Sequence, residues 1–150
     1  MKNIFDKTVT DNVIERINQL NSNSKQKWGK MNVGQMLAHC CVTYEFVYDN
    51  KHPKPKGFKK WMLKTFVKKI VTNNTPYKKN GRTAPEFLMT NEKEFNTEKD
   101  RLTSYILKTQ ELGSNHFDQK ESHSFGKLNI IEWNNMFYKH LDHHLSQFGV

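Results

Sequence analysis

The stretch IIEWNNMFYKHLDHHLSQFG, residues 130–149, decides the fold, because its apolar residues recur at the spacing of an α-helix. Successive residues of an α-helix are about 100° apart, so one face gathers the apolar side chains. These are Ile130, Trp133, Phe137, Leu141 and Phe148. An apolar stripe of this kind is normally buried against other elements. The stretch therefore predicts a helix over 130–148 with one face in a core.

Three further stretches have helical patterns. The first runs from about Asp6 to Leu20, and a long polar one from about Asn91 to Leu112. Between them, VGQMLAHCCVTYEFVY (33–48) is apolar on nearly every side and follows Asn32, a predicted N-cap with Gln35 at the capping-box position. No alternating pattern typical of a strand is found. We expect an all-α chain, most simply a four-helix bundle, forming a single domain over 1–150.

The positive charge is confined to one segment. Residues 50–85 hold ten lysines, one arginine and no acid (+11), whereas the rest holds 13 basic and 15 acidic residues (−2). Within it, FKKWMLKTFVKKIV (58–71) predicts an extra helix between the second and third main helices. Its apolar stripe is Phe58, Trp61, Met62, Phe66 and Ile70, and its lysines lie away from that stripe. We expect the stripe to cover the bundle or a second subunit as a lid; an anionic membrane surface or nucleic acid is the alternative.

The ends and the cysteines indicate a cytoplasmic protein. The start, MKNIFDKTVT, has no apolar run typical of a signal peptide, and no stretch is apolar over the roughly 18 residues of a membrane span. Cys40 and Cys41 are adjacent, and neighbouring cysteines rarely form a relaxed disulfide. We expect both to be structural, with a cysteine metal ligand as the alternative.

Two histidines of the last helix, His140 and His144, are four residues apart on its buried side, whereas His143 points away. Buried imidazoles need partners for their ring nitrogens, which either a metal or hydrogen bonds in the core would supply. The spacing is that of zinc proteases with an HExxH motif, but Leu141 stands where their glutamate would be. His39, in the apolar helix 33–48, is the best third ligand; His52 and His116 are expected at the surface.

Three stretches resemble the DinB/YfiT-like superfamily of metal-binding four-helix bundles, and more narrowly a branch catalogued as a domain of unknown function. They are WGKMNVGQMLAHC (28–40), TAPEF (83–87) and HSFGKLNIIEWNNMFYKHLDHHLSQFG (123–149). HSFGKLN resembles the motif His-Pro-x-Phe-Gly-x-Leu-Thr of that branch, with Ser124 and Asn129 replacing proline and threonine. The resemblance is loose over 50–80. It implies that His39, His140 and His144 bind a divalent metal.

The resemblance also implies a function, because characterised members of the superfamily include thiol-dependent transferases. We expect a metalloenzyme, a transferase or hydrolase acting on a small molecule, in which zinc or nickel, or else iron or cobalt, activates water or a low-molecular-weight thiol. His123, Glu132, Asp142 and His143 are candidates to orient ligands or to handle protons. A non-catalytic metal-binding bundle and a basic binding protein are the alternatives. A homodimer is a further prediction, and no nucleic-acid partner is expected.

Overall fold

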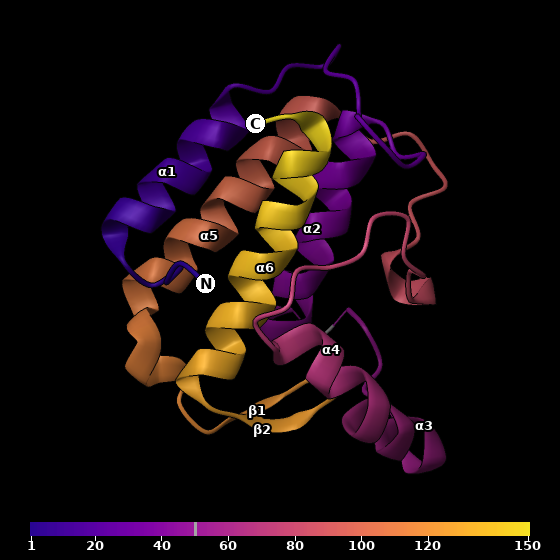
Figure 1. Ribbon diagram of the computed structural model, residues 1–150, viewed down its shortest axis with the longest axis vertical. Coiled ribbons are helices and arrows are strands. Elements are labelled where there is room, and N and C mark those ends of the chain that lie inside the picture. Colours follow the sequence, from indigo (N-terminus) through magenta and orange to yellow (C-terminus); the bar gives the residue numbers. More distant parts are fainter. Residues whose placement is uncertain (50) are drawn as a thin grey trace.

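Four long helices lie side by side in a computed structural model that describes residues 1–49 and 51–150. They are α1 (Lys7–Asn18), α2 (Val33–Tyr48), α5 (Phe95–Phe117) and α6 (Ile130–Phe148). Helix α6 contacts the other three, and α5 contacts α1 and α2 (Figure 1). The expectation of an all-α chain is thus confirmed in outline: the described residues are mostly helical.

Capping boxes fix the first residue of both helices that carry the candidate ligands. The side chain of Asn32 accepts a hydrogen bond from the backbone N–H of Gln35 (2.8 Å), and the Gln35 side chain accepts one from the Asn32 N–H (3.0 Å). Asn129 and Glu132 form the same pair at the start of α6. Each box satisfies two backbone donors that a helix start leaves unpaired, so asparagine at 129 caps the helix well.

Stacked aromatic rings form the centre of the core. Phe137 of α6 lies parallel to Tyr44 of α2, with ring centroids 5.1 Å apart, and stacks on Trp133 of its own helix. Phe117, at the end of α5, meets both Trp133 and Phe137. The predicted buried face of α6 is therefore confirmed, and the rings set how closely α6 approaches α2.

Helix α5 begins and ends later than the sequence suggested. It begins at Phe95 rather than near Asn91, because the Glu94 side chain accepts hydrogen bonds from the N–H groups of Asn96 and Thr97. Gly113 interrupts the helix with a φ of 71°, yet helical turns resume as far as Phe117. Burial of the Phe117 ring accounts for this extra turn.

A short antiparallel hairpin, β1 (Lys120–Ser122) with β2 (Gly126–Leu128), contradicts the expectation that no strand is present. Its turn is closed by Ser122, whose hydroxyl donates to the Gly126 carbonyl and accepts from the Phe125 N–H. Gly126 adopts a φ of 78°, which favours glycine. Strands of three residues are too short for an alternating pattern to be recognised in the sequence.

The basic segment is helical as predicted, running through α3 (Gly57–Met62), a π-helical turn (Leu63–Val67) and α4 (Lys68–Thr72). The prediction that its apolar stripe covers the bundle is wrong, since Phe58 is 75% exposed and Phe66 60%. The half-buried apolar side chains belong to the other face, namely Leu63, Val67 and Val71. These aliphatic side chains are spaced four residues apart and pack toward the rest of the protein. The large aromatic rings lie on the other side of the segment and stay exposed to solvent.

The end of α4 is fastened to α6 by Lys139. The Lys139 ammonium is buried and donates hydrogen bonds to the Ile70 carbonyl (2.8 Å) and to the carbonyl and side-chain oxygens of Asn73 (2.7 and 2.9 Å). Beyond α4, residues 73–94, including the 3-10 turn Pro85–Phe87, return to the start of α5. Within the described part of the chain, no helix is both long enough and apolar enough to cross a membrane.

Candidate metal centre

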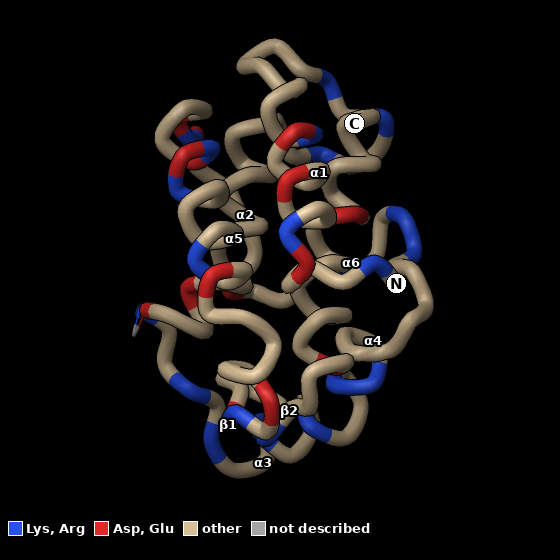
Figure 2. Tube along the Cα trace, turned by 90° about the vertical axis from the view of Figure 1, so that its left-hand side faces the viewer, with Lys and Arg blue, Asp and Glu red and all other residues tan. Residues whose placement is uncertain are grey.

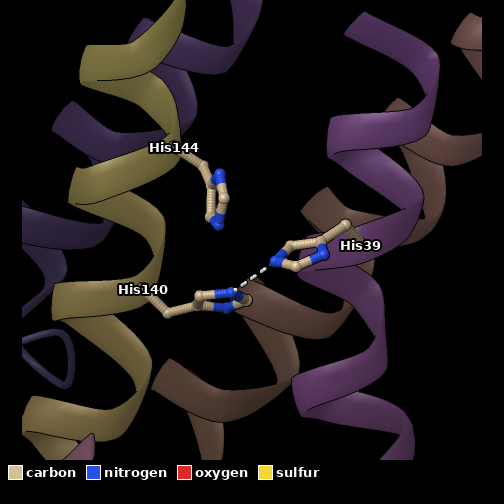
Figure 3. Close-up of side chains that lie close together, drawn as sticks. All are labelled: His39, His140 and His144. Carbon is tan, nitrogen blue, oxygen red and sulfur yellow. Dashed lines mark hydrogen bonds between the residues drawn. The ribbon is translucent and has the colours of Figure 1, made fainter. Parts of the chain in front are cut away.

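Three imidazoles from two helices meet at one point of the bundle. His39 projects from α2, and His140 and His144 project from consecutive turns of α6 (Figure 3). The Nε2 atoms of His39 and His140 are 3.0 Å apart, and one nitrogen of each ring lies within 4.8 Å of those of the other two. The structure therefore brings together the three histidines that the sequence singled out.

The outer nitrogen of every ring is already engaged. The Nδ1 atoms pair with the Phe87 carbonyl (His39, 2.8 Å), the Thr43 hydroxyl (His140, 3.0 Å) and the Gln147 side-chain oxygen (His144, 2.8 Å). Carbonyl oxygens only accept, so His39 and His144 carry their proton on Nδ1. Their Nε2 atoms then carry lone pairs, and that of His39 accepts the Nε2–H of His140 in the 3.0 Å contact. Because the Thr43 hydroxyl can donate or accept, His140 can carry its proton on Nδ1 instead and offer its own Nε2 to a metal.

The side-chain amide of Gln147 has a fixed orientation, because its nitrogen already donates a hydrogen bond. That nitrogen donates to the Trp28 carbonyl at 2.7 Å, which directs the oxygen at His144. Gly29, with a φ of +84°, leaves room for this amide; a Cβ at position 29 would overlap with the Gln147 side chain. Trp28 and Gly29 thus orient the His144 ring indirectly, because they fix the position of the buried Gln147 side chain.

Burial favours the neutral form of all three rings. It lowers the pKa of His39, lowers that of His140 well below the ordinary value of 6.5, and lowers that of His144 to about 3. Repulsion between neighbouring rings acts in the same direction. Only a neutral imidazole has a lone pair for a metal, so these surroundings keep the ligands ready to bind one.

The nitrogen spacing fits a transition metal. Metal–nitrogen bonds to histidine are about 2.0–2.1 Å, so two nitrogens on one ion are at most about 4.2 Å apart. The His39 and His140 nitrogens are within that limit at 3.0 Å, and all three nitrogens lie within 4.8 Å of one another, so small ring rotations are enough to bring them onto one ion. Three neutral nitrogen donors suit zinc, nickel, iron or cobalt. The residues present therefore fit such an ion.

Aromatic side chains surround the three histidines. Phe87 lies against His39 and His140, with centroid distances of 5.2 and 5.7 Å, and Tyr77 lies edge-on to His140. Next to them is a cavity of about 210 Å³. Its lining includes Trp28, Tyr77, Lys79, Lys139, Asp142 and His143. None of the three histidines lines this cavity, but Tyr77 and His143 do, and their rings lie against His140 and His144.

Of the candidate supporting residues, only His143 lies next to a ligand, with its ring edge-on to His144 at a centroid distance of 5.0 Å. Asp142 instead pairs with Arg16 at 2.9 Å. Glu132 caps α6 and pairs with Lys68. The Asp142 and Glu132 carboxylates are therefore paired with other side chains. Among the described residues, neither contacts one of the three proposed ligands.

His123 lies apart from the three ligands. Its ring stacks on Phe46 at a centroid distance of 4.2 Å, and its Nε2 atom donates to the His52 carbonyl. Phe46 in turn meets Phe87, which contacts His39. Two phenyl rings therefore separate His123 from the ligand group.

The remaining histidines and the cysteines lie elsewhere. His116 is exposed at the end of α5, whereas His52, expected at the surface, is half-buried because it pairs with Glu45 at 2.6 Å. Cys40 and Cys41 are free and buried in the core, and burial raises the pKa of the Cys41 thiol to about 12. Neither thiol belongs to the group of potential ligands.

Sequence reasoning missed four residues that position or enclose the histidines. Thr43 follows His39 by one helical turn and Gln147 follows His144 by three residues, so helical spacing could have identified both. Phe87 and Tyr77 come from the irregular stretch between α4 and α5. No periodic pattern there indicates which backbone carbonyl will reach His39.

Comparison with known proteins supplies a family but no activity. No curated protein and no solved structure matches the chain. A family model described as "Protein of unknown function (DUF1569)" matches residues 3–149. The match includes both helices of the histidine group and the hairpin. The chain belongs to this family.

Proposed function

We propose that this member of a family of unknown function binds one divalent transition metal through His39, His140 and His144. The observation that carries the proposal is the paired state of the rings: each Nδ1 has its own partner and each Nε2 faces the other two. Ligand histidines commonly use one nitrogen for the metal and the other for a hydrogen bond that holds the ring. An arrangement of the DinB/YfiT type, a four-helix bundle with this ligand set, is part of the proposal.

We further propose that the centre is catalytic. Three protein ligands leave a coordination position open, which is typical of catalytic rather than structural zinc sites. Zinc or nickel is the preferred ion, with iron or cobalt next. A metal bound here would act as a Lewis acid and lower the pKa of a water or thiol bound to it. The reaction class is that of a transferase or hydrolase, with a low-molecular-weight thiol as a candidate co-substrate.

The cavity beside the histidines supports a small-molecule substrate. Trp28 and Tyr77 offer apolar ring faces, and Lys79 lies over the Trp28 ring at 4.2 Å from its centroid. Phe87 and Tyr77 place two aromatic rings against His140, on one side of the ligand group. A molecule with a flat apolar part and a negative group would match these walls.

A reducing, cytoplasmic setting is also proposed, in keeping with two free cysteines. A homodimer remains a prediction.

The first test is elemental analysis of the purified protein and of single alanine variants. The wild type should contain about one divalent transition metal ion per chain, and His39→Ala, His140→Ala and His144→Ala should each lose most of it. His116→Ala is the matched control, since that ring is exposed at the far end of α5. Full metal content in both His140→Ala and His144→Ala would disprove the site.

A second measurement separates a catalytic centre from a closed one. Cobalt(II) substituted into the protein gives visible absorption bands that depend on its ligands. Addition of a small thiol should shift these bands in the wild type, because one position is open to exchange. A cobalt spectrum that is insensitive to thiols, azide and other small ligands would favour the non-catalytic metal-binding alternative.

A further inference from the structure

The basic helical segment 57–72 has a large apolar face that no described part of the chain covers. We call it the outer face: Phe58, Trp61, Met62, Phe66 and Ile70, exposed by 75, 53, 39, 60 and 59%. Its three aromatic rings contact one another, Phe58 with Trp61 at 5.5 Å and Trp61 with Phe66 at 5.9 Å between centroids. Figure 1 shows α3 projecting from the end of the bundle, beyond the four long helices. The rings thus form one continuous projecting apolar surface.

The segment is held in place without the outer face. Its half-buried side chains Leu63, Val67 and Val71 lie on the opposite side. Lys68 pairs with Glu132 of α6 at 2.8 Å, and Lys139 binds the end of α4. The outer face is therefore free to bind another surface, and changing it does not remove these attachments.

Lysines are spread over the basic segment and the residues just before it, and four of them lack a described acidic partner. Lys54, Lys56, Lys64 and Lys69 are exposed and form no ion pair with any described residue. The nearby acids are already engaged, Glu86 with Lys59, Glu121 with Lys60 and Glu132 with Lys68. Figure 2 shows basic residues gathered around α3, α4 and the hairpin. The surroundings of the outer face are thus strongly cationic.

We propose that the outer face docks on an anionic phospholipid surface, with the helical segment lying in the plane of the headgroups. A helix with aromatic and aliphatic residues on one face and lysines around it binds such interfaces through apolar burial and attraction to anionic lipids. Trp61 would lie at headgroup depth, where tryptophan is enriched. The partner is thus defined by two properties together, negative charge and an apolar interior.

Other occupants fit less well. A second copy docking through the same face would bring two strongly basic segments together, with like charges opposed. Nucleic acid would satisfy the lysines but would leave Met62 and Ile70 without an apolar partner, and the segment 51–85 contains a single arginine, the residue that most often reads bases. Of these three occupants, a lipid surface alone matches both the charge and the apolar area.

The test is sedimentation of the metal-loaded 150-residue chain with vesicles of phosphatidylcholine alone or mixed with phosphatidylserine. The protein should bind only the anionic vesicles, less strongly as salt is raised, and its tryptophan emission should shift to the blue. Trp61→Ser with Phe66→Ser should weaken binding by roughly tenfold or more. Lys56→Gln with Lys64→Gln and Lys69→Gln should weaken it about fivefold per lysine, or roughly a hundredfold in all.

Matched controls lie elsewhere on the molecule. Lys2→Gln with Lys25→Gln and Lys30→Gln removes the same charge from exposed sites, and Leu107→Ser with Leu112→Ser removes exposed apolar side chains from α5. Both controls should bind vesicles nearly as well as the wild type. Circular dichroism and metal content, which should stay unchanged in all four variants, distinguish a failed docking surface from a failed fold or metal site.

Three outcomes would overturn the proposal. Equal binding to neutral and anionic vesicles would remove the role of the lysines. No vesicle binding, together with a wild-type dimer that the Trp61→Ser and Phe66→Ser changes dissociate, would identify a second copy as the occupant. Binding to duplex DNA that survives loss of both rings, without vesicle binding, would identify nucleic acid.

Discussion

At the scale of single residues, each proposed ligand depends on one neighbour for its orientation. For His144 this neighbour is Gln147, a buried side chain that joins the Trp28 carbonyl to the His144 ring. Without it the ring could turn about its χ2 angle, and Nδ1–H would lack an acceptor. Hydrogen bonds of this kind commonly change metal affinity by 10–100-fold.

Gln147→Leu should therefore weaken metal binding by about one to two orders of magnitude without abolishing it. The side chain keeps most of its volume but loses the acceptor for His144. Competition against a chromophoric chelator measures the affinity directly. Ser146→Ala, an exposed change on the same helix, should leave the affinity at its wild-type value. An equal affinity in Gln147→Leu would show that packing alone orients His144.

The ligand trio was predictable for a local reason. His140 and His144 share a helix, so their common direction follows from a spacing of four residues, and His39 lies in the most apolar stretch of the chain. The Phe87 carbonyl that holds His39 comes from 48 residues away through an irregular segment. Its position depends on how residues 73–94 cross the bundle, which no local pattern encodes.

At the scale of elements, Lys139 is one of three α6 side chains that bind α4, with Asn135 on the Thr72 carbonyl and Glu132 on Lys68. Burial lowers the pKa of its ammonium to about 8, which shows that taking the charge out of water is costly. Three oxygens at the end of α4 compensate for that cost, and the ammonium also lies over the Tyr77 ring at 4.7 Å from its centroid. The same residue thus anchors the basic segment and one wall of the cavity.

Lys139→Met should lower the free energy of unfolding by about 1–3 kcal/mol, because the apolar stem is retained but the oxygens of Ile70 and Asn73 lose a charged donor. Urea unfolding measures this loss, and hydrogen exchange should show faster opening of the amides of α4 than of α2. Lys64→Met, at an exposed position, is the control. If the stability and the exchange of α4 stayed unchanged, the anchoring role would be wrong.

Element ends were predicted best where a side chain caps the helix. The capping box predicted at Asn32 places the start of α2 correctly, and the last helix begins at Ile130 as predicted, behind a capping box at Asn129. The end of α5 was misplaced because Gly113 resembles a terminator, yet burial of Phe117 draws the chain into another turn. The outer face of the basic helix was predicted to be covered. A sequence pattern shows that apolar residues share one side of a helix, but it does not show whether another element packs against that side.

At the scale of the whole molecule, the three histidines make stability depend on pH. Each has a folded-state pKa below the ordinary value of 6.5 because burial opposes its charged form. Below pH 6.5 these histidines therefore bind protons in the unfolded chain but stay neutral in the folded chain. The sign follows: stability that is fully present above pH 6.5 is lost as the pH falls toward the folded-state pKa values.

The metal-free protein should lose stability between pH 6.5 and pH 4.5, the ordinary pKa values of histidine and glutamate. Each histidine contributes up to about 1.4 kcal/mol per pH unit. Carboxylates whose pKa is lowered, such as Glu86 and Asp49, destabilise the fold only at lower pH. The slope in this window therefore comes from histidines, and His116, His123 and His143, whose pKa burial also lowers, add to that of the three ligands. Urea unfolding across the window, with metal and with chelator, measures the slope.

Metal should protect the fold over that same window, because it binds only the neutral rings and must be displaced before they take up protons. The metal-loaded protein should accordingly hold its stability to a lower pH than the chelated protein, and the two curves should converge once the ion is released. His144→Gln should flatten the slope of the metal-free protein, since one buried group no longer titrates. A metal-free stability that does not change between pH 6.5 and pH 4.5 would mean that the rings take up protons without opening the bundle.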